Sequence, residues 1–449
     1  MAPDRIRTQI ALRGAVALAG LLFAAYTLLA PAVRAQKNPH PPVRGNAAVK
    51  SNDAVARLQQ RLDRGEAKLE FSKPGGWLQS VLKQLDIPVS SQSLVFSRTS
   101  LQSGNINIAN PRAIYFNDDV YVGWIRGADI LEIAAVDPQV GGVYYTLEQD
   151  NPAPQPFVRQ DTCMRCHVSP NTRFIPGYFV RSILPEGFLE GVTNITTMIT
   201  DHTSPFSERW GGWYVTGTHH ENGHLGNMPL PGDGNHGNPE QLSGGSLTSL
   251  ARKVDLTGYA APHSDIVAMM VLAHQTQMQN LMVYVEYETN MALAADEETA
   301  RAGKIAKGQI SAAARWRIGL AVDELLRYML FADEAPLHGE VKGTSGYAEQ
   351  FMARGPRDQG GRSLRDFDLQ RRMFRYPLSY QIYTAAFDAL PAPALDILYR
   401  KLWEGLGGET RDKAFAALSA ADRRAILEIL TDTKKNLPDY FYGNRGRAE

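Results

Sequence analysis

The chain of 449 residues contains only two cysteines, and they lie three positions apart in the run Cys163-Met164-Arg165-Cys166-His167. A disulfide between them would close a very short loop and would constrain the unfolded chain little. No disulfide framework can therefore connect distant segments, so a fold of this size has to depend on buried apolar side chains.

The spacing of these five residues also indicates a chemistry. In a C-x-x-C-H arrangement each thiol can add to one vinyl group of a haem, and the histidine that follows can give an imidazole nitrogen to the iron. We therefore expect Cys163 and Cys166 to attach one covalent haem c, with His167 as the proximal iron ligand. Asp161 or Thr162 would cap a short helix that holds both thiols on one side.

Three other interpretations of the cysteine pair fit less well. A redox pair of the thioredoxin type would be expected at the start of a helix in a βαβ unit, but a Pro-rich segment precedes this motif. A zinc site would need scattered histidines as further ligands, because the chain has no second C-x-x-C. A structural disulfide would link only near neighbours.

The N-terminus has the pattern of a targeting segment. Arg5, Arg7 and Arg13 precede an apolar stretch at residues 14–29. We predict a signal peptide at residues 1–35, or an uncleaved anchor, because the apolar stretch is long for a signal peptide. The protein is then expected in the periplasm or otherwise exported, and it would contact the inner membrane only through such an anchor.

The hydrophobic period of the remaining chain changes twice. It is helical at first, then alternates as in strands, with two predicted hairpins that join 113–116 to 120–124 and 131–136 to 143–147. After residue 264 it is again mainly helical, with Trp316, Leu320 and Leu326 predicted on one helical stripe. Residues 177–184 and 210–216 resemble further strands. Ser419 and Asp422 would form the capping box of a last helix.

These patterns predict an α+β protein with a small antiparallel β-rich N-terminal part, a central haem c segment and a mainly helical C-terminal part. The predicted segments are a signal peptide or anchor at 1–35, a linker at 36–52, a β-rich domain at 53–150, the haem attachment segment with a His-rich loop at 151–250, and a helical domain at 251–449. Lys plus Arg and Asp plus Glu both number 47, so no overall field favours nucleic acid as a partner.

The second axial position of the iron decides the function, and three residues are candidates for it. Met228 lies in a loop and could offer a thioether, although an ordinary loop methionine has the same pattern. His274 lies on an apolar helical stripe four residues before Met278, where a hydrogen-bonded core histidine is the alternative. His224 belongs to a His-rich loop.

That loop also contains His219 and His220, and His202 precedes it. The spacing would permit a metal site or a distal haem ligand, whereas a solvated polar loop explains the same residues. The side chains that we would first test around the haem propionates and ring edge are Arg173, Arg181, Arg209, Trp210, Trp213 and Tyr214. Aromatic residues in such positions also build ordinary cores.

Beyond the C-x-x-C-H motif of c-type cytochromes, the stretch through residues 200–206 to residues 209–219 resembles a group of large exported bacterial single-haem cytochrome c domain proteins of unassigned activity. The resemblance extends through 364–440. In that group a His-Met-Gly-Asn element follows Thr-Gly-Thr-His, whereas this chain has His224-Leu225-Gly226-Asn227. The departure makes His224 the first choice for the distal ligand and His274 the next.

The resemblance implies haem binding and electron transfer, and it supplies no substrate. We predict an exported single-haem cytochrome that exchanges electrons with a redox partner protein or with a small-molecule donor or acceptor. The alternative is a haem c enzyme, peroxidase-like or another small-molecule oxidoreductase, with an open sixth iron position. A plain carrier needs neither a chain of this length nor the long loop.

Overall fold

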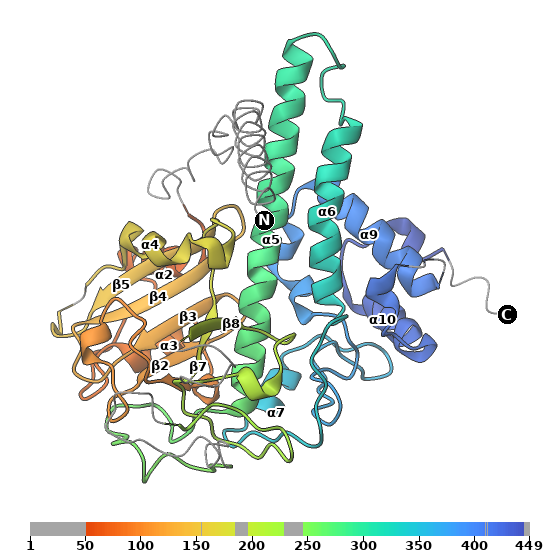
Figure 1. The fold of residues 1–449 in the computed structure, drawn as a ribbon. Coiled ribbons are helices and arrows are strands. Elements are labelled where there is room, and N and C mark those ends of the chain that lie inside the picture. Colours follow the sequence, from red (N-terminus) through yellow and green to blue (C-terminus); the bar gives the residue numbers. More distant parts are fainter. Residues whose placement is uncertain are drawn as a thin grey trace, which may run out of the picture. The chain divides into compact units, whose positions relative to one another are not determined.

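The computed structural model of the chain describes residues 51–153, 155–184, 196–228, 246–408, 410 and 412–443 (Figure 1). The predicted signal peptide or anchor lies outside these residues, and the predicted limits between the later segments stay predictions. The described part is α+β, with an antiparallel sheet in the first half and mainly helices in the second half. All of it belongs to one compact unit, Asn46–Glu449.

The first half forms a six-stranded antiparallel sheet in which each strand pairs with the next one in sequence (Figure 1). Its strands are β1 (Ser93–Val95), β2 (Arg112–Phe116), β3 (Val120–Trp124), β4 (Ile130–Asp137), β5 (Gly141–Glu148) and β6 (Val158–Arg159). Both predicted hairpins are confirmed as β2–β3 and β4–β5. The sequence did not indicate β1 and β6 because strands of 3 and 2 residues are too short to show alternation.

The two faces of this sheet contribute to different cores. Tyr115, Val122 and Tyr145 belong to a core shared with the helices α2 (Ala54–Asp63) and α3 (Leu78–Gln84). Phe116 and Tyr144, their neighbours in sequence, face a second core that contains the C-terminal helices. This division follows from the alternation of side chains along a strand. Each large apolar side chain fully buried in this way contributes about 1.5–3 kcal/mol.

A separate two-stranded ribbon pairs β7 (Val180–Leu184) with β8 (Thr196–Thr200). The predicted strand at 210–216 is wrong at its start, because the chain turns at residues 210–212. Beyond the turn, Trp213 and Thr216 form isolated bridges to Val95 and Asp265. Trp210 and Gly212 have φ angles of 68° and 87°, which belong to the left-handed region. At Gly211 a β-carbon would collide with the carbonyl oxygen of Ile183, so this turn requires a residue without a side chain.

The 36-residue helix α5 (Ile266–Arg301) runs through the second core. Every residue from 266 to 276 is buried, as expected for a helix that is covered on all sides. Asp265 is its N-cap and is itself fully buried. Its Oδ1 accepts hydrogen bonds from the amides of Val267 and Ala268, and its Oδ2 accepts three more, from the amides of Thr344 and Ser345 and from the Ser345 hydroxyl.

The C-terminal part adds α6 (Ala312–Met329), α7 (Tyr347–Ala353), α8 (Ala385–Asp388), α9 (Ala392–Gly407) and α10 (Ala420–Thr433). The predicted capping box of Ser419 and Asp422 is confirmed at the start of α10. The predicted stripe on α6 is wrong in two of its three positions, since Trp316 and Leu320 are 69% and 52% exposed. In the described part of the chain, no helix combines the length and apolar character that a membrane span requires.

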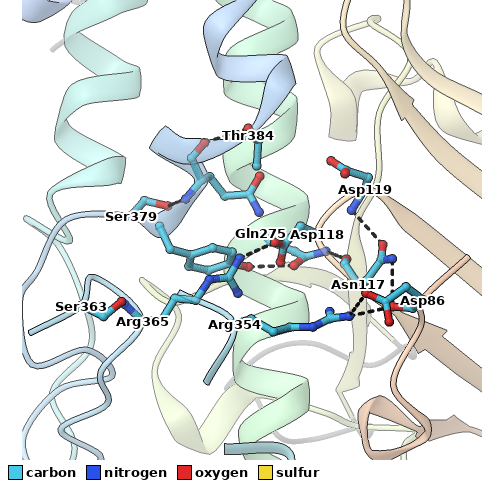
Figure 2. Close-up of polar contacts among 12 residues, drawn as sticks. Asp86, Asn117, Asp118, Asp119, Gln275, Arg354, Ser363, Arg365, Ser379 and Thr384 are labelled. Carbon is cyan, nitrogen blue, oxygen red and sulfur yellow. Dashed lines mark hydrogen bonds and ion pairs between the residues drawn. The ribbon is translucent and has the colours of Figure 1, made fainter. Parts of the chain in front are cut away.

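A polar junction connects the sheet to the helical part. Figure 2 shows Arg365 directed at Asp118, in the turn between β2 and β3, and Gln275 of α5 beside it. The Arg365 guanidinium is buried and also lies over the rings of Phe351 and Tyr380, at 4.5 and 4.4 Å from their centroids. The position of this charge, between one carboxylate and two aromatic faces, offsets its loss of hydration.

We expect Asp265→Ala to lower the free energy of unfolding by about 3 kcal/mol or more. Loss of an N-cap costs about 1 kcal/mol, and each buried donor left without an acceptor costs about 1–3 kcal/mol. Asp412→Ala is the control, because Asp412 is itself exposed and caps only the three-residue turn Lys413–Phe415, so its loss should cost about 1 kcal/mol. Urea unfolding measures both, and equal losses would contradict the special role of Asp265.

Candidate functional site

The C-x-x-C-H run forms one helical segment directly after β6. A 3₁₀ turn, Asp161–Cys163, continues into the short α-helix α4, Met164–His167. The predicted cap by Asp161 or Thr162 is wrong, because Gln160 is the N-cap and its side chain makes no capping bond. Both thiols are free, with Cys163 half-buried and Cys166 exposed. Their spacing of nearly one helical turn places them on the same side of the segment.

A backbone carbonyl fixes the orientation of His167. Its Nδ1 lies 2.8 Å from the carbonyl oxygen of Gly177, and its ring packs beside Tyr144 and Phe179 with centroids 4.6 and 5.3 Å away. Because a carbonyl only accepts hydrogen bonds, Nδ1 must carry the proton, and Nε2 keeps its lone pair. Burial lowers the pKa of His167, which favours this neutral form.

The segment that carries Gly177 is itself held by α5. The Asn280 side chain accepts from the amide of Tyr178 at 2.8 Å and donates to its carbonyl at 2.6 Å. The Tyr144 hydroxyl donates to the Gly177 carbonyl at 2.6 Å. A β-carbon on Gly177 would collide with Asn280 Oδ1, so close packing requires glycine here.

Charged side chains surround the motif. Arg112 on β2 and Glu132 on β4 form an ion pair with N and O 2.6 Å apart, and the Arg181 guanidinium lies 5.2 Å from the Phe179 centroid. The buried Nε atoms of Arg112 and Arg181 have no hydrogen-bond partner among the described residues. Such donors could bind an anionic group, and both cations act on His167 electrostatically by lowering its pKa.

The environment of Cys163 differs from that of a redox-active thiol. Burial, followed by the Glu132 carboxylate, raises the pKa of Cys163 to about 11. Thiols that exchange disulfides have lowered pKa values instead. The site therefore does not favour the thioredoxin-type interpretation.

The residues around the motif fit a covalently attached haem. They supply two free thiols, an imidazole Nε2 with a lone pair, and unpartnered guanidinium donors. Val158 and Phe174, which flank the motif, are 48% and 49% exposed, so apolar surface is present for a porphyrin to cover.

His274 lies in a different environment. It is fully buried, with Nδ1 2.8 Å from Nδ1 of His202 and Nε2 2.8 Å from the Ser379 hydroxyl. Its ring stacks on Tyr328 and Phe331, and burial lowers its pKa to about 3. Both ring nitrogens are thus hydrogen-bonded. This matches the hydrogen-bonded core histidine that the sequence left open as the alternative to an iron ligand.

His224 is buried but keeps one nitrogen without a partner. Its Nδ1 accepts from the amide of Gly226 at 3.0 Å, and its Nε2 has no hydrogen-bond partner among the described residues. The neighbouring rings are Phe206, Trp210 and His219. Burial, followed by the charge of His219, lowers the pKa of His224 to about 3.

Met228 packs with Leu225 and Met198. Met198 on β8 pairs with Ser182 on β7, so it lies on the ribbon face opposite to that of Arg181. The ring contacts of His274 and His224 include neither Tyr144 nor Phe179, the two rings beside His167. The described contacts therefore bring none of the three candidate ligands next to the motif.

The other side chains named from the sequence are dispersed. Arg173 forms an ion pair with Glu324, and Arg209 donates to the carbonyls of His202 and Ser204. Trp210, Trp213 and Tyr214 are buried in the cores. Within the described ranges, no three His, Cys, Asp or Glu side chains gather as a metal site. Sequence reasoning missed Tyr144, Gly177 and Asn280, and only the Pro-Gly step at 176–177 gave a signal, that of a turn.

A cleft of about 400 Å³ lies elsewhere, between α6 and α9. Its lining includes Arg315 and Arg400 together with Asp396 and Glu404, so opposite charges balance within it. It shares no residue with the surroundings of His167 or of the other histidines. We therefore place the candidate site at the motif, where the chemistry is, and not at this cleft.

We expect the protein to lose stability as the pH falls below about 6.5. The pKa of His274 is depressed in the folded state, so the unfolded chain binds more protons between about pH 6.5 and 3. This histidine should account for about 2 kcal/mol between pH 7 and 5. The measurement is urea unfolding at both pH values. His274→Asn should lose that part of the pH dependence, and an unchanged dependence would contradict the assignment.

Comparison with known proteins shows no relationship for this chain. No family model matches it, and no curated protein and no solved structure is significantly similar to it.

Proposed function

We propose that this chain attaches one haem c through Cys163 and Cys166, uses His167 as an axial ligand of the iron, and transfers electrons outside the cytoplasm. The observation that carries the proposal is the orientation of His167 within the C-x-x-C-H turn. Its protonated Nδ1 donates to the Gly177 carbonyl, which leaves Nε2 as the ligand atom.

The chain's own residues would determine the properties of such a centre. The hydrogen bond to the Gly177 carbonyl raises the pKa of His167 against the larger lowering by burial, and it orients the ring. Arg112 and Arg181 offer donors for carboxylate groups, and Val158 and Phe174 offer apolar cover. When bound, a haem supplies reversible one-electron exchange at its iron.

The N-terminal pattern and the cysteine content both support the proposed compartment. The basic and apolar N-terminal pattern directs export, to the periplasm or with an anchor in the inner membrane. The chain has no other cysteine that would have to form a disulfide there. As electron partners we propose a redox protein or a small-molecule donor or acceptor.

A second candidate function is a haem c enzyme with an open sixth position, such as a peroxidase-like oxidoreductase. It is favoured by one observation, namely that His224, His274 and Met228 make no described contact with the surroundings of His167. Of these three, His224 is our first choice as a distal ligand, because its Nε2 has no hydrogen-bond partner among the described residues, whereas both nitrogens of His274 are bonded.

We expect Cys163→Ala with Cys166→Ala to abolish covalent haem, because both thioether bonds are then lost. The measurement is pyridine haemochrome analysis of denatured protein from cells that assemble c-type cytochromes. Arg165→Ala is the matched control, since Arg165 lies exposed within the same motif and should keep the haem. Haem that survives denaturation in the double variant would refute the assignment.

We expect the ferric protein to be low-spin, as a six-coordinate electron carrier requires. His224→Ala should convert it to a high-spin form, whereas His220→Ala, at an exposed position of the same loop, should leave the optical spectrum unchanged. A high-spin wild-type protein that turns over peroxide with an artificial donor would favour the enzyme instead. An unchanged His224→Ala spectrum would exclude His224 as the ligand.

A further inference from the structure

The connection between α5 and α6 forms the exposed tip of a helical hairpin. Figure 1 shows the two helices side by side, with their connection standing clear of the other described elements. None of the residues from 297 to 313 is buried. We call residues 297–320, which include the first turns of α6, the hairpin tip.

The hairpin tip has a net positive charge in a chain whose net charge is zero. It contains five basic residues, namely Arg301, Lys304, Lys307, Arg315 and Arg317, and two acidic ones, Glu297 and Glu298. Arg301 and Arg317 form ion pairs with Glu297 and Glu288 of α5, and Arg315 lines the cleft beside α9. Lys304 and Lys307 form no ion pair within the described part of the chain, and both are exposed.

Large apolar side chains are exposed on α6 within the same hairpin tip. Trp316 and Leu320 are 69% and 52% exposed, and their spacing of four residues places them on one face of α6. Four of the other five tryptophans are buried in the cores, so exposure at Trp316 is exceptional for this chain. The exposed apolar residues of the described part are few, and two of them meet here.

An anionic phospholipid surface fits this combination better than a protein surface does. Tryptophan is the side chain that prefers the membrane interface, and each lysine near an anionic leaflet adds attraction for its headgroups. A stable dimer needs roughly 800 Å² of contact from each partner. Two apolar side chains on a narrow tip offer much less than that.

The N-terminal pattern adds an independent reason. Arg5, Arg7 and Arg13 precede the apolar stretch at 14–29, which the sequence leaves open as an uncleaved anchor. An uncleaved anchor would hold the folded unit close to a bilayer, so that a weak second contact with the surface forms at a high effective concentration. The inference does not depend on the haem, because it uses no residue of the motif.

We propose that the hairpin tip docks on the surface of an anionic bilayer, with Trp316 and Leu320 at the lipid interface and Lys304 and Lys307 on the headgroups. The two apolar side chains replace contact with water by contact with acyl chains. The lysines stay in water and neutralise phosphate charge, which makes the attachment sensitive to salt. Docking would hold the folded unit against the membrane across which the chain is proposed to be exported.

The test uses the full chain and vesicles of phosphatidylcholine with or without phosphatidylglycerol. We expect hydrogen exchange to slow in residues 297–320 only with the anionic vesicles. The variant with Lys304→Gln, Lys307→Gln and Trp316→Ser should bind them roughly tenfold or more weakly. The matched control combines Arg252→Gln, Lys253→Gln and Leu101→Ser, which are exposed residues outside the hairpin tip, and should bind like the wild type.

Each other outcome overturns the proposal. Protection confined to the N-terminal segment would show that the anchor alone binds, and equal binding by both triple variants would show that the hairpin tip does not contribute. If the hairpin-tip variant changes the sedimentation coefficient without vesicles, the tip joins copies of this chain. Protection only after addition of an acidic protein would identify a protein partner instead.

Discussion

The buried carboxylate of Asp265 is the contact on which the arrangement of the fold depends. It begins α5 by capping the first amides of that helix, and its second oxygen binds the chain at Thr344 and Ser345, about 80 residues later. A charged group with no access to water is tolerated only when hydrogen bonds surround it. Because five donors meet this one carboxylate, the start of α5 has a single position relative to the residues that lead into α7.

The position of α5 in turn determines two quite different histidine environments. Asn280 holds the backbone of Tyr178, and the adjacent Gly177 carbonyl orients the half-buried ring of His167. Six residues before Asn280 on α5, His274 points into an aromatic core where both of its ring nitrogens are hydrogen-bonded. One helix therefore supports an imidazole with an available Nε2 and also an imidazole that serves packing.

Residue type alone is therefore a weak guide to iron ligands in this chain. His167, His224 and His274 all lie within apolar surroundings, yet they differ in which nitrogen is engaged and by what. That difference arises from partners such as Gly177, Gly226 and Ser379, which are far from one another in sequence. A histidine pattern alone contains no information about such partners.

The sequence by itself determined the local features. The C-x-x-C-H spacing, the hairpins β2–β3 and β4–β5, helix α5 and the capping box of α10 all depend on contacts within a few residues, which periodicity and turn chemistry reveal. Only the tertiary structure decided the turn at Trp210–Gly212, the exposed face of α6 and the contacts that engage the candidate distal ligands. These depend on which segments meet across the chain, and a single sequence does not encode that in any local pattern.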